Sequence, residues 1–214
     1  MSELLHKLEE LRVFLQENSI RRGTFTLASG MQTPYYCDTK ATTLSPAGSR
    51  LVGEVLFGLL RDCDAEAVGG LALGATYVAA AVALISGQRG HPLYGYTVRE
   101  ERKGHGLLKE VEESAHPDGQ PLLSPGRRVA VVDDVVTGGG SIQKAIDTVR
   151  SKGCEIVAVV AIVDRRAGGG ERLLSEGLPY LALFETDESG TLHANVPALI
   201  HRATSEPARV GALR

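Results

Sequence analysis

Hydrophobic positions recur along the chain in short blocks whose spacing predicts alternating helices and strands. Leucines between positions 4 and 15 follow helical spacing, so residues 3–17 are expected to form an amphipathic helix. Short strands at 25–27 and 35–37 should follow it, divided by a turn. Ser45-Pro46 then starts a helix that runs to about Arg61, because serine caps free N–H groups and proline is tolerated in the first turn.

Apolar blocks and helical segments alternate along the rest of the chain. Strands are expected at 66–71, 92–98, 128–132, 155–163 and 179–184, and helices at 75–86, 141–152 and 170–176. Short apolar strands separated by helices indicate βαβ crossovers, and therefore an α/β fold with a mostly parallel central sheet flanked by helices. The sequence contains no repeat or linker, so 1–214 is interpreted as a single domain. Ligands are expected at the carboxyl ends of the strands.

Composition excludes several classes of protein. The chain has 214 residues, 43% of them hydrophobic, which is typical of a globular domain and not of a disordered chain. Its 23 basic and 26 acidic residues give a net charge of −3, which disfavours general binding to nucleic acid or to an anionic membrane. Residues 67–88 carry no charge, but the glycines within this stretch favour a strand, a turn and a core helix over a membrane span.

The expected location is the cytoplasm. The charged N-terminus lacks the features of a signal peptide. The three cysteines, Cys37, Cys63 and Cys154, are far apart and form no CxxC pair, so neither a disulfide framework nor a cysteine zinc site is indicated.

The most informative segment is residues 129–141, which read VAVVDDVVTGGGS. A strand, the acidic pair Asp133-Asp134, a glycine loop and a helix start follow one another here. Glycines at 138–140 allow the backbone to approach a ligand, and Thr137, Ser141 and the helix N-terminus supply hydrogen-bond donors that suit a phosphate. The two carboxylates could position ribose hydroxyls or, through water, a Mg²⁺ ion that bridges a pyrophosphate.

Other interpretations of this segment are weaker. The sequence has no GxxxxGK[ST] motif, and Gln143 stands where a GxGxxG motif would have its last glycine. In the remaining alternative, the acidic pair merely ends a strand and the glycines make a turn.

Residues 129–141 resemble the motif with which type I phosphoribosyltransferases bind 5-phosphoribosyl 1-pyrophosphate (PRPP). Three further motifs resemble those of orotate phosphoribosyltransferases in order and spacing, so the resemblance covers nearly the whole chain. They are FTLASG from Phe25 followed by Pro34-Tyr-Tyr, Arg99-x-x-x-Lys103-x-His105-Gly, and Asp164-Arg165.

This resemblance implies a role for each matching residue. Asp133 and Asp134 would contact the ribose hydroxyls, and Leu73-Gly74 would hold pyrophosphate through its backbone. The 5-phosphate would be wrapped by Val135, Val136, Thr137, Gly138, Gly139, Gly140 and Ser141.

The resemblance also implies an orotate site. Thr137 would lie near orotate, and Arg165 would pair with the carboxylate that distinguishes orotate from uracil. Tyr35 and Tyr36 would lie against the base, the alternative for this aromatic pair being packing in the core. Residues 1–40 would contribute a small hood over the base.

Residues 99–113 are rich in charge and contain almost no apolar side chain, so they are not expected to pack into a core. A solvated loop is the plain interpretation. The resemblance implies instead a mobile catalytic loop, in which Arg99, Lys103 and His105 close over PRPP in the neighbouring site of a homodimer. Three positions depart from many relatives, which carry lysine where this chain has Ala28, Gly74 and Glu100.

The implied reaction is the Mg²⁺-dependent conversion of orotate and PRPP to orotidine 5′-monophosphate and pyrophosphate, in pyrimidine (UMP) synthesis. Two alternatives stay open: a phosphoribosyltransferase for another base, such as a purine, and a non-catalytic regulator of the same fold that senses PRPP or nucleotides. The substrates would be small molecules, with no nucleic acid or membrane partner.

Overall fold

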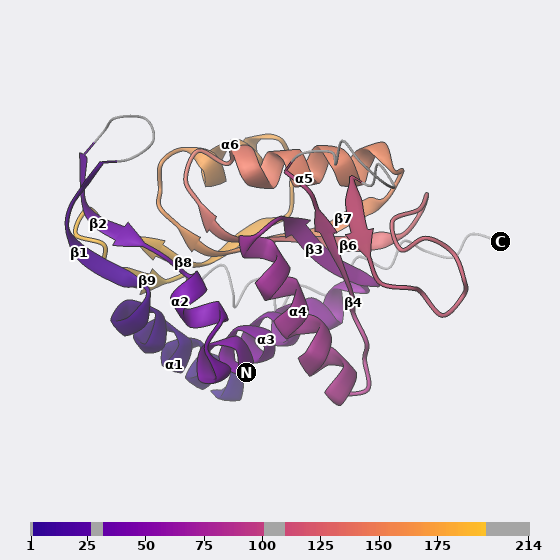
Figure 1. The fold of residues 1–214 in the computed structure, drawn as a ribbon, viewed down its shortest axis with the longest axis horizontal. Coiled ribbons are helices and arrows are strands. Elements are labelled where there is room, and N and C mark those ends of the chain that lie inside the picture. The colour runs from indigo at the N-terminus through magenta and orange to yellow at the C-terminus, as the bar shows by residue number, and fades with distance from the viewer. Residues whose placement is uncertain (1, 27–31, 101–109, 196–214) are drawn as a thin grey trace.

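A mixed seven-stranded sheet forms the centre of the molecule (Figure 1). The computed structural model describes residues 2–26, 32–100 and 110–195, to which all structural statements refer. The strands, in the order in which they pair, are β5 (Val111–Glu113), β4 (Tyr94–Val98), β3 (Ala67–Leu71), β6 (Arg128–Val136), β7 (Glu155–Asp164), β8 (Tyr180–Thr186) and β9 (Leu192–Ala194). The five central strands run parallel, and β5 and β9 pair antiparallel at the two edges.

Helices cover both faces of this sheet (Figure 1). On one face pack α1 (Ser2–Asn18), α3 (Pro46–Leu60) and α4 (Gly74–Gln88), and on the other α5 (Gly140–Ser151) and α6 (Gly169–Ser175). Alternate residues of the central strands enter the two cores: Ala130 and Val132 face α3 and α4, whereas Val129 and Val131 face α5. The central strands are continuous apolar runs because both of their faces are buried. The mostly parallel sheet with helices on both faces confirms the predicted fold class.

A separate two-stranded hairpin stands beside β8 and β9 and forms the hood (Figure 1). It consists of β1 (Ile20–Thr26) and β2 (Gln32–Cys37), and a short helix, α2 (Lys40–Thr43), follows it. The hydroxyl of Tyr35 lies 2.7 Å from that of Thr186, the last residue of β8. The hairpin is thereby held near the edge of the sheet where the parallel strands end.

Most predicted elements are present. Ser45 caps α3 by accepting a hydrogen bond of 3.1 Å from the Gly48 N–H. The uncharged stretch 67–88 forms β3 and α4, and no helix in the described part of the chain is long and apolar enough to cross a membrane. The three cysteines are free thiols.

The sequence missed α2, β5 and β9, and it ended β6 four residues too early. Residues 111–113, assigned to the charged segment, pair with β4, and Val111 packs against the core. The expectation that nothing in this segment packs was therefore wrong for Val111. Both missed strands have three residues, and the edge of an existing sheet supplies their backbone partners.

Candidate active site

Asp133 and Asp134 lie near the carboxyl end of β6, but their environments differ. The Asp134 N–H donates to Asp133 Oδ1 at 3.0 Å, so the two residues are in direct contact. Asp133 is only 5% exposed, whereas Asp134 is half-buried. Burial, together with the charge of Asp134, raises the pKa of Asp133 to about 8. Burial therefore disfavours the charged form of Asp133, and the pair is not two equivalent carboxylates.

The glycine loop after β6 leads directly into α5. Gly139 precedes the helix in the left-handed conformation, with φ of 75°, which glycine adopts without strain. Among the described residues, no neighbouring heavy atom lies within 4 Å of the place where a Cβ would stand on Gly138 or Gly140. The open loop and the free N–H groups of the helix start therefore leave room and donors for an anionic group such as a phosphate.

The start of α6 supports this loop from behind. The Gly169 N–H donates to the Thr137 carbonyl at 3.0 Å, and Arg172 Nη2 donates to the Gly139 carbonyl at 3.1 Å. A Cβ on Gly169 would lie 2.5 Å from the Thr137 oxygen and 2.8 Å from the Gly139 nitrogen. Sequence reasoning missed this role, although the glycine run at 168–170 was a signal for close backbone approach.

The turn between β3 and α4 faces the same edge. Leu73 is 63% exposed, and Gly74 begins α4. A Cβ on Gly74 would overlap the carboxylate of Asp134, so the two residues are in direct contact. The sheet order, which places β3 beside β6, brings this turn to the acidic pair.

Arg165 follows β7 and binds the hood. Its Nε donates to the Tyr35 hydroxyl and its Nη2 to Thr33 Oγ1, both at 3.3 Å. The guanidinium carbon lies 4.8 Å from the centre of the Tyr35 ring, a cation–π distance. Tyr35 and Thr33, which are 130 and 132 positions away in the chain, thus fix the place of this cation at the sheet edge.

The two tyrosines that the sequence grouped together have different surroundings. Tyr35 is 5% exposed and belongs to the core, as the alternative interpretation had it. Tyr36 is 42% exposed and lies against Phe25, with ring centres 5.7 Å apart. Contact of either ring with a base stays a prediction, and the exposed Tyr36 is the better placed for it.

Arg99 directly follows β4 and forms an ion pair with Glu112 of β5. Its N–H donates to the Glu110 carbonyl at 2.9 Å, which holds the two ends of segment 99–110 together. Lys144 of α5 donates to the carbonyl of Glu100, so this segment begins beside the helix that follows the glycine loop. Lys103 and His105 lie outside the described residues, as does Ala28.

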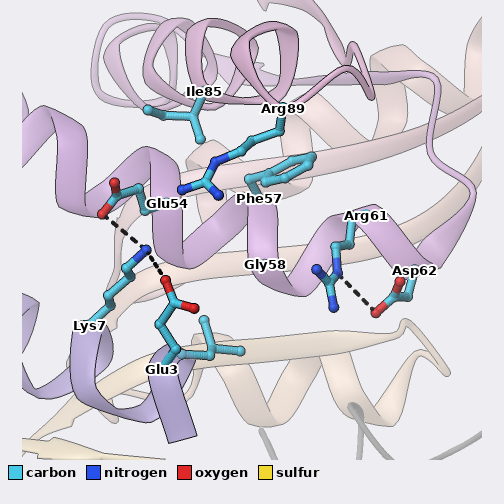
Figure 2. Close-up of a pocket in the computed structure, with 10 residues that line it drawn as sticks. Glu3, Lys7, Glu54, Phe57, Gly58, Arg61, Asp62, Ile85 and Arg89 are labelled. Atoms are coloured by element: carbon cyan, nitrogen blue, oxygen red, sulfur yellow. Dashed lines mark hydrogen bonds and ion pairs between the residues drawn. The ribbon is translucent and has the colours of Figure 1, made fainter. Parts of the chain in front are cut away.

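A cavity of about 270 Å³ lies elsewhere, between α1, α3 and the last turn of α4 (Figure 2). Lys7 contacts Glu3 at 2.9 Å and Glu54 at 3.7 Å across it, which ties α1 to α3. This cavity lies at the end of α4 remote from Gly74, and its Arg61-Asp62 precede β3. It therefore belongs to the amino end of the sheet, whereas ligands of such sheets bind at the carboxyl end.

The fold and this edge, with its glycine loop and acidic pair, define a phosphoribosyltransferase. A family model described as "Phosphoribosyl transferase domain" matches residues 67–174. Orotate phosphoribosyltransferase of Aquifex aeolicus is 38% identical over 188 residues, which are 86% of this chain and 98% of that protein. The chain belongs to the orotate phosphoribosyltransferase family.

Solved structures of orotate phosphoribosyltransferases are similar to this chain in fold and sequence. Orotate phosphoribosyltransferase of Mycobacterium tuberculosis H37Rv in complex with Fe(III) dicitrate has a TM-score of 0.72 and 34% identity, and the match covers 86% of this chain and 99% of that one. The same enzyme in complex with PRPP has a TM-score of 0.65 and 29% identity, over 86% and 92% of the two chains.

We expect Gly169→Ala to weaken binding of a phosphate ester, because the new methyl group would push the Thr137 and Gly139 backbone out of position. A roughly tenfold rise in the Kd of ribose 5-phosphate, about 1.4 kcal/mol, should be measurable by calorimetry. Gly87→Ala is the matched control, because nothing lies within 4 Å of its Cβ position in α4. Equal affinity of the Gly169 variant and the wild type would contradict the supporting role of α6.

Proposed function

We propose that this protein transfers the 5-phosphoribosyl group of PRPP to orotate, giving orotidine 5′-monophosphate and pyrophosphate in pyrimidine synthesis. The observation that carries this proposal is the position of Arg165, which Tyr35 and Thr33 hold at the same sheet edge as the glycine loop. A cation that can pair with two oxygens suits the orotate carboxylate, and the loop suits the ribose phosphate.

PRPP would lie along the ends of β3 and β6. Residues 135–141 would bind the 5-phosphate through backbone N–H groups and hydroxyls, and Leu73-Gly74 would meet the pyrophosphate. Asp134, with Asp133 beside it, would bind the ribose hydroxyls. The structure of the M. tuberculosis relative with PRPP supports this choice of ligand.

Magnesium fits this site only together with the substrate. Within the described residues no cluster of three or more His, Cys, Asp or Glu side chains could hold a metal ion. Mg²⁺ is commonly bound through one or two carboxylates plus substrate phosphates, and Asp134, with Asp133 nearby, offers that set. Bound with PRPP, the ion would neutralise charge on the pyrophosphate.

The chain's own residues would act by alignment and electrostatics. Departure of pyrophosphate leaves positive charge on the ribose ring and negative charge on the leaving group, so no protein nucleophile is needed. Arg99, Lys103 and His105 would stabilise the leaving group, and Arg165 would align orotate. Gly74 and Glu100 supply no positive charge here, which leaves more of that task to Arg99, Lys103 and the metal ion.

Two other functions are less well supported. A purine offers no carboxylate for Arg165, and a nucleic-acid-binding regulator would need a basic surface that a net charge of −3 does not provide.

Mixing the protein with Mg²⁺, PRPP and one base at a time distinguishes these functions. Orotate should be consumed, as followed by ultraviolet absorbance, and uracil, hypoxanthine and adenine should not. Turnover of a purine instead of orotate would overturn the proposed substrate, and absence of turnover with every base would favour the regulator.

Arg165→Ala should weaken orotate binding while leaving the affinity for PRPP nearly unchanged. Loss of one charge-assisted hydrogen bond costs about 1.5–3 kcal/mol, which corresponds to a roughly 10- to 150-fold rise in the KM for orotate. Arg166→Ala is the matched control, because Arg166 is the exposed neighbour that pairs with Glu185. An equal loss of affinity for both substrates would assign Arg165 to the fold or to the phosphate site.

The proposed homodimer, with residues 99–113 completing the neighbouring site, predicts that two inactive variants complement each other. A Lys103→Ala chain is mixed with an Asp133→Asn, Asp134→Asn chain under conditions that allow subunit exchange. If the loop crosses the interface, one site of each heterodimer carries both lesions and the other carries none. Up to half of the wild-type activity per heterodimer should then return. If exchange is confirmed and no activity returns, the loop serves its own subunit.

A further inference from the structure

Thr39 connects the hood to the acidic pair. It lies between β2 and α2 and is completely buried. Its Oγ1 donates a hydrogen bond to Asp134 Oδ2 at 2.5 Å, across 95 positions of the chain. The Thr39 carbonyl accepts the N–H groups of Thr42 and Thr43 at 2.9 and 2.8 Å, which fixes the backbone that carries the hydroxyl.

Gly74 confines the same carboxylate from another direction. The carboxylate of Asp134 occupies the space in which the side chain of residue 74 would begin, so any Cβ there would overlap it. Any side chain at this position and the observed orientation of Asp134 are therefore mutually exclusive. Glycine gives Asp134 a place that only a residue without a side chain leaves open.

A hydrogen bond from a hydroxyl to a carboxylate is among the stronger ones in proteins, and it fixes one oxygen of the acceptor. Threonine has a single hydroxyl proton, and here it is directed to Oδ2 of Asp134. The second oxygen is thereby held in one orientation at the end of β6. Holding a polar group in place before the ligand arrives removes an ordering cost from binding.

The neighbouring threonines show that burial alone does not explain this contact. The Thr42 hydroxyl lies 2.7 Å from that of Ser19 and joins two parts of the N-terminal region. The Thr43 hydroxyl is buried and, among the described residues, has no hydrogen-bond partner. Of these three buried threonines, Thr39 is the one whose hydroxyl contacts the acidic pair.

We propose that Thr39 is a positioning residue, which orients Asp134 toward the ribose of PRPP with Gly74 providing the space. This inference rests on the proposed function and adds a residue to it. It also makes the link between β2 and α2 part of the PRPP site, so the hood supports both substrates.

Thr39→Val keeps the shape of the side chain and removes the hydroxyl, and Thr39→Ser keeps the hydroxyl. We expect Thr39→Val to raise the Kd of PRPP, measured by calorimetry with Mg²⁺ in the absence of orotate, about tenfold or more. The KM for orotate should stay within about twofold. Thr39→Ser should restore PRPP affinity to within about threefold of the wild type, and the control Thr43→Val should behave as the wild type does.

A double-mutant cycle with Asp134→Asn separates positioning from a general effect on the fold. If Thr39 acts through Asp134, Thr39→Val should have no further effect on PRPP affinity in the Asp134→Asn background. A full additional loss there, or a Thr39→Ser variant as weak as Thr39→Val, would overturn the inference.

Gly74→Ala provides an independent test should Thr39→Val fail to fold. The new Cβ must displace the Asp134 carboxylate, so PRPP affinity should fall as it does in Thr39→Val. Unchanged affinity would contradict the inference. If Asp134→Asn itself binds PRPP as the wild type does, the proposed role of Asp134 fails. If that variant is impaired and Thr39→Val is not, only the inference about Thr39 fails.

Discussion

The parallel pairing of β3, β6 and β7 is the constraint on which the site depends. Val136 of β6 is in register with Asp164 of β7, and the Arg165 N–H continues the ladder by donating to the Val136 carbonyl at 2.9 Å. Residues that follow two different strands therefore emerge at one level of the sheet. The backbone hydrogen bonds between β6 and β7 therefore place the glycine loop and Arg165 next to each other.

The hood docks on this edge of the sheet and adds its own side chains to it. Its polar contacts with the sheet include those of Tyr35 and Thr33 with Arg165, of Tyr35 with Thr186, and of Thr39 with Asp134. Each contact joins the hairpin region to a residue at the end of a parallel strand. The same interactions that dock the N-terminal segment on the body therefore also hold the charged groups at this edge of the sheet in place.

The glycine loop after β6 could be predicted because its signals are local in the sequence. The features that sequence reasoning missed depend on tertiary contacts. A buried strand, an acidic pair, glycines and a helix start lie within 13 consecutive residues, 129–141, so their arrangement follows from sequence alone. The supports of that loop come from Gly169 and Arg172, whose role depends on where α6 packs. The short β5 and β9 have little pattern of their own and exist because an edge strand offers partners. Adjacent tyrosines in a strand must face opposite ways, but only the docked hairpin shows that Tyr35 is the buried one.

The hydrogen bonds around Tyr35 connect the core to the guanidinium of Arg165. Arginine can only donate, so the Tyr35 oxygen accepts the Nε–H of Arg165, and the same hydroxyl shares a hydrogen bond with Thr186 Oγ1, 2.7 Å away. Tyr35 therefore transmits the position of β8 to the guanidinium, so the place of this cation at the sheet edge is set from within the sheet.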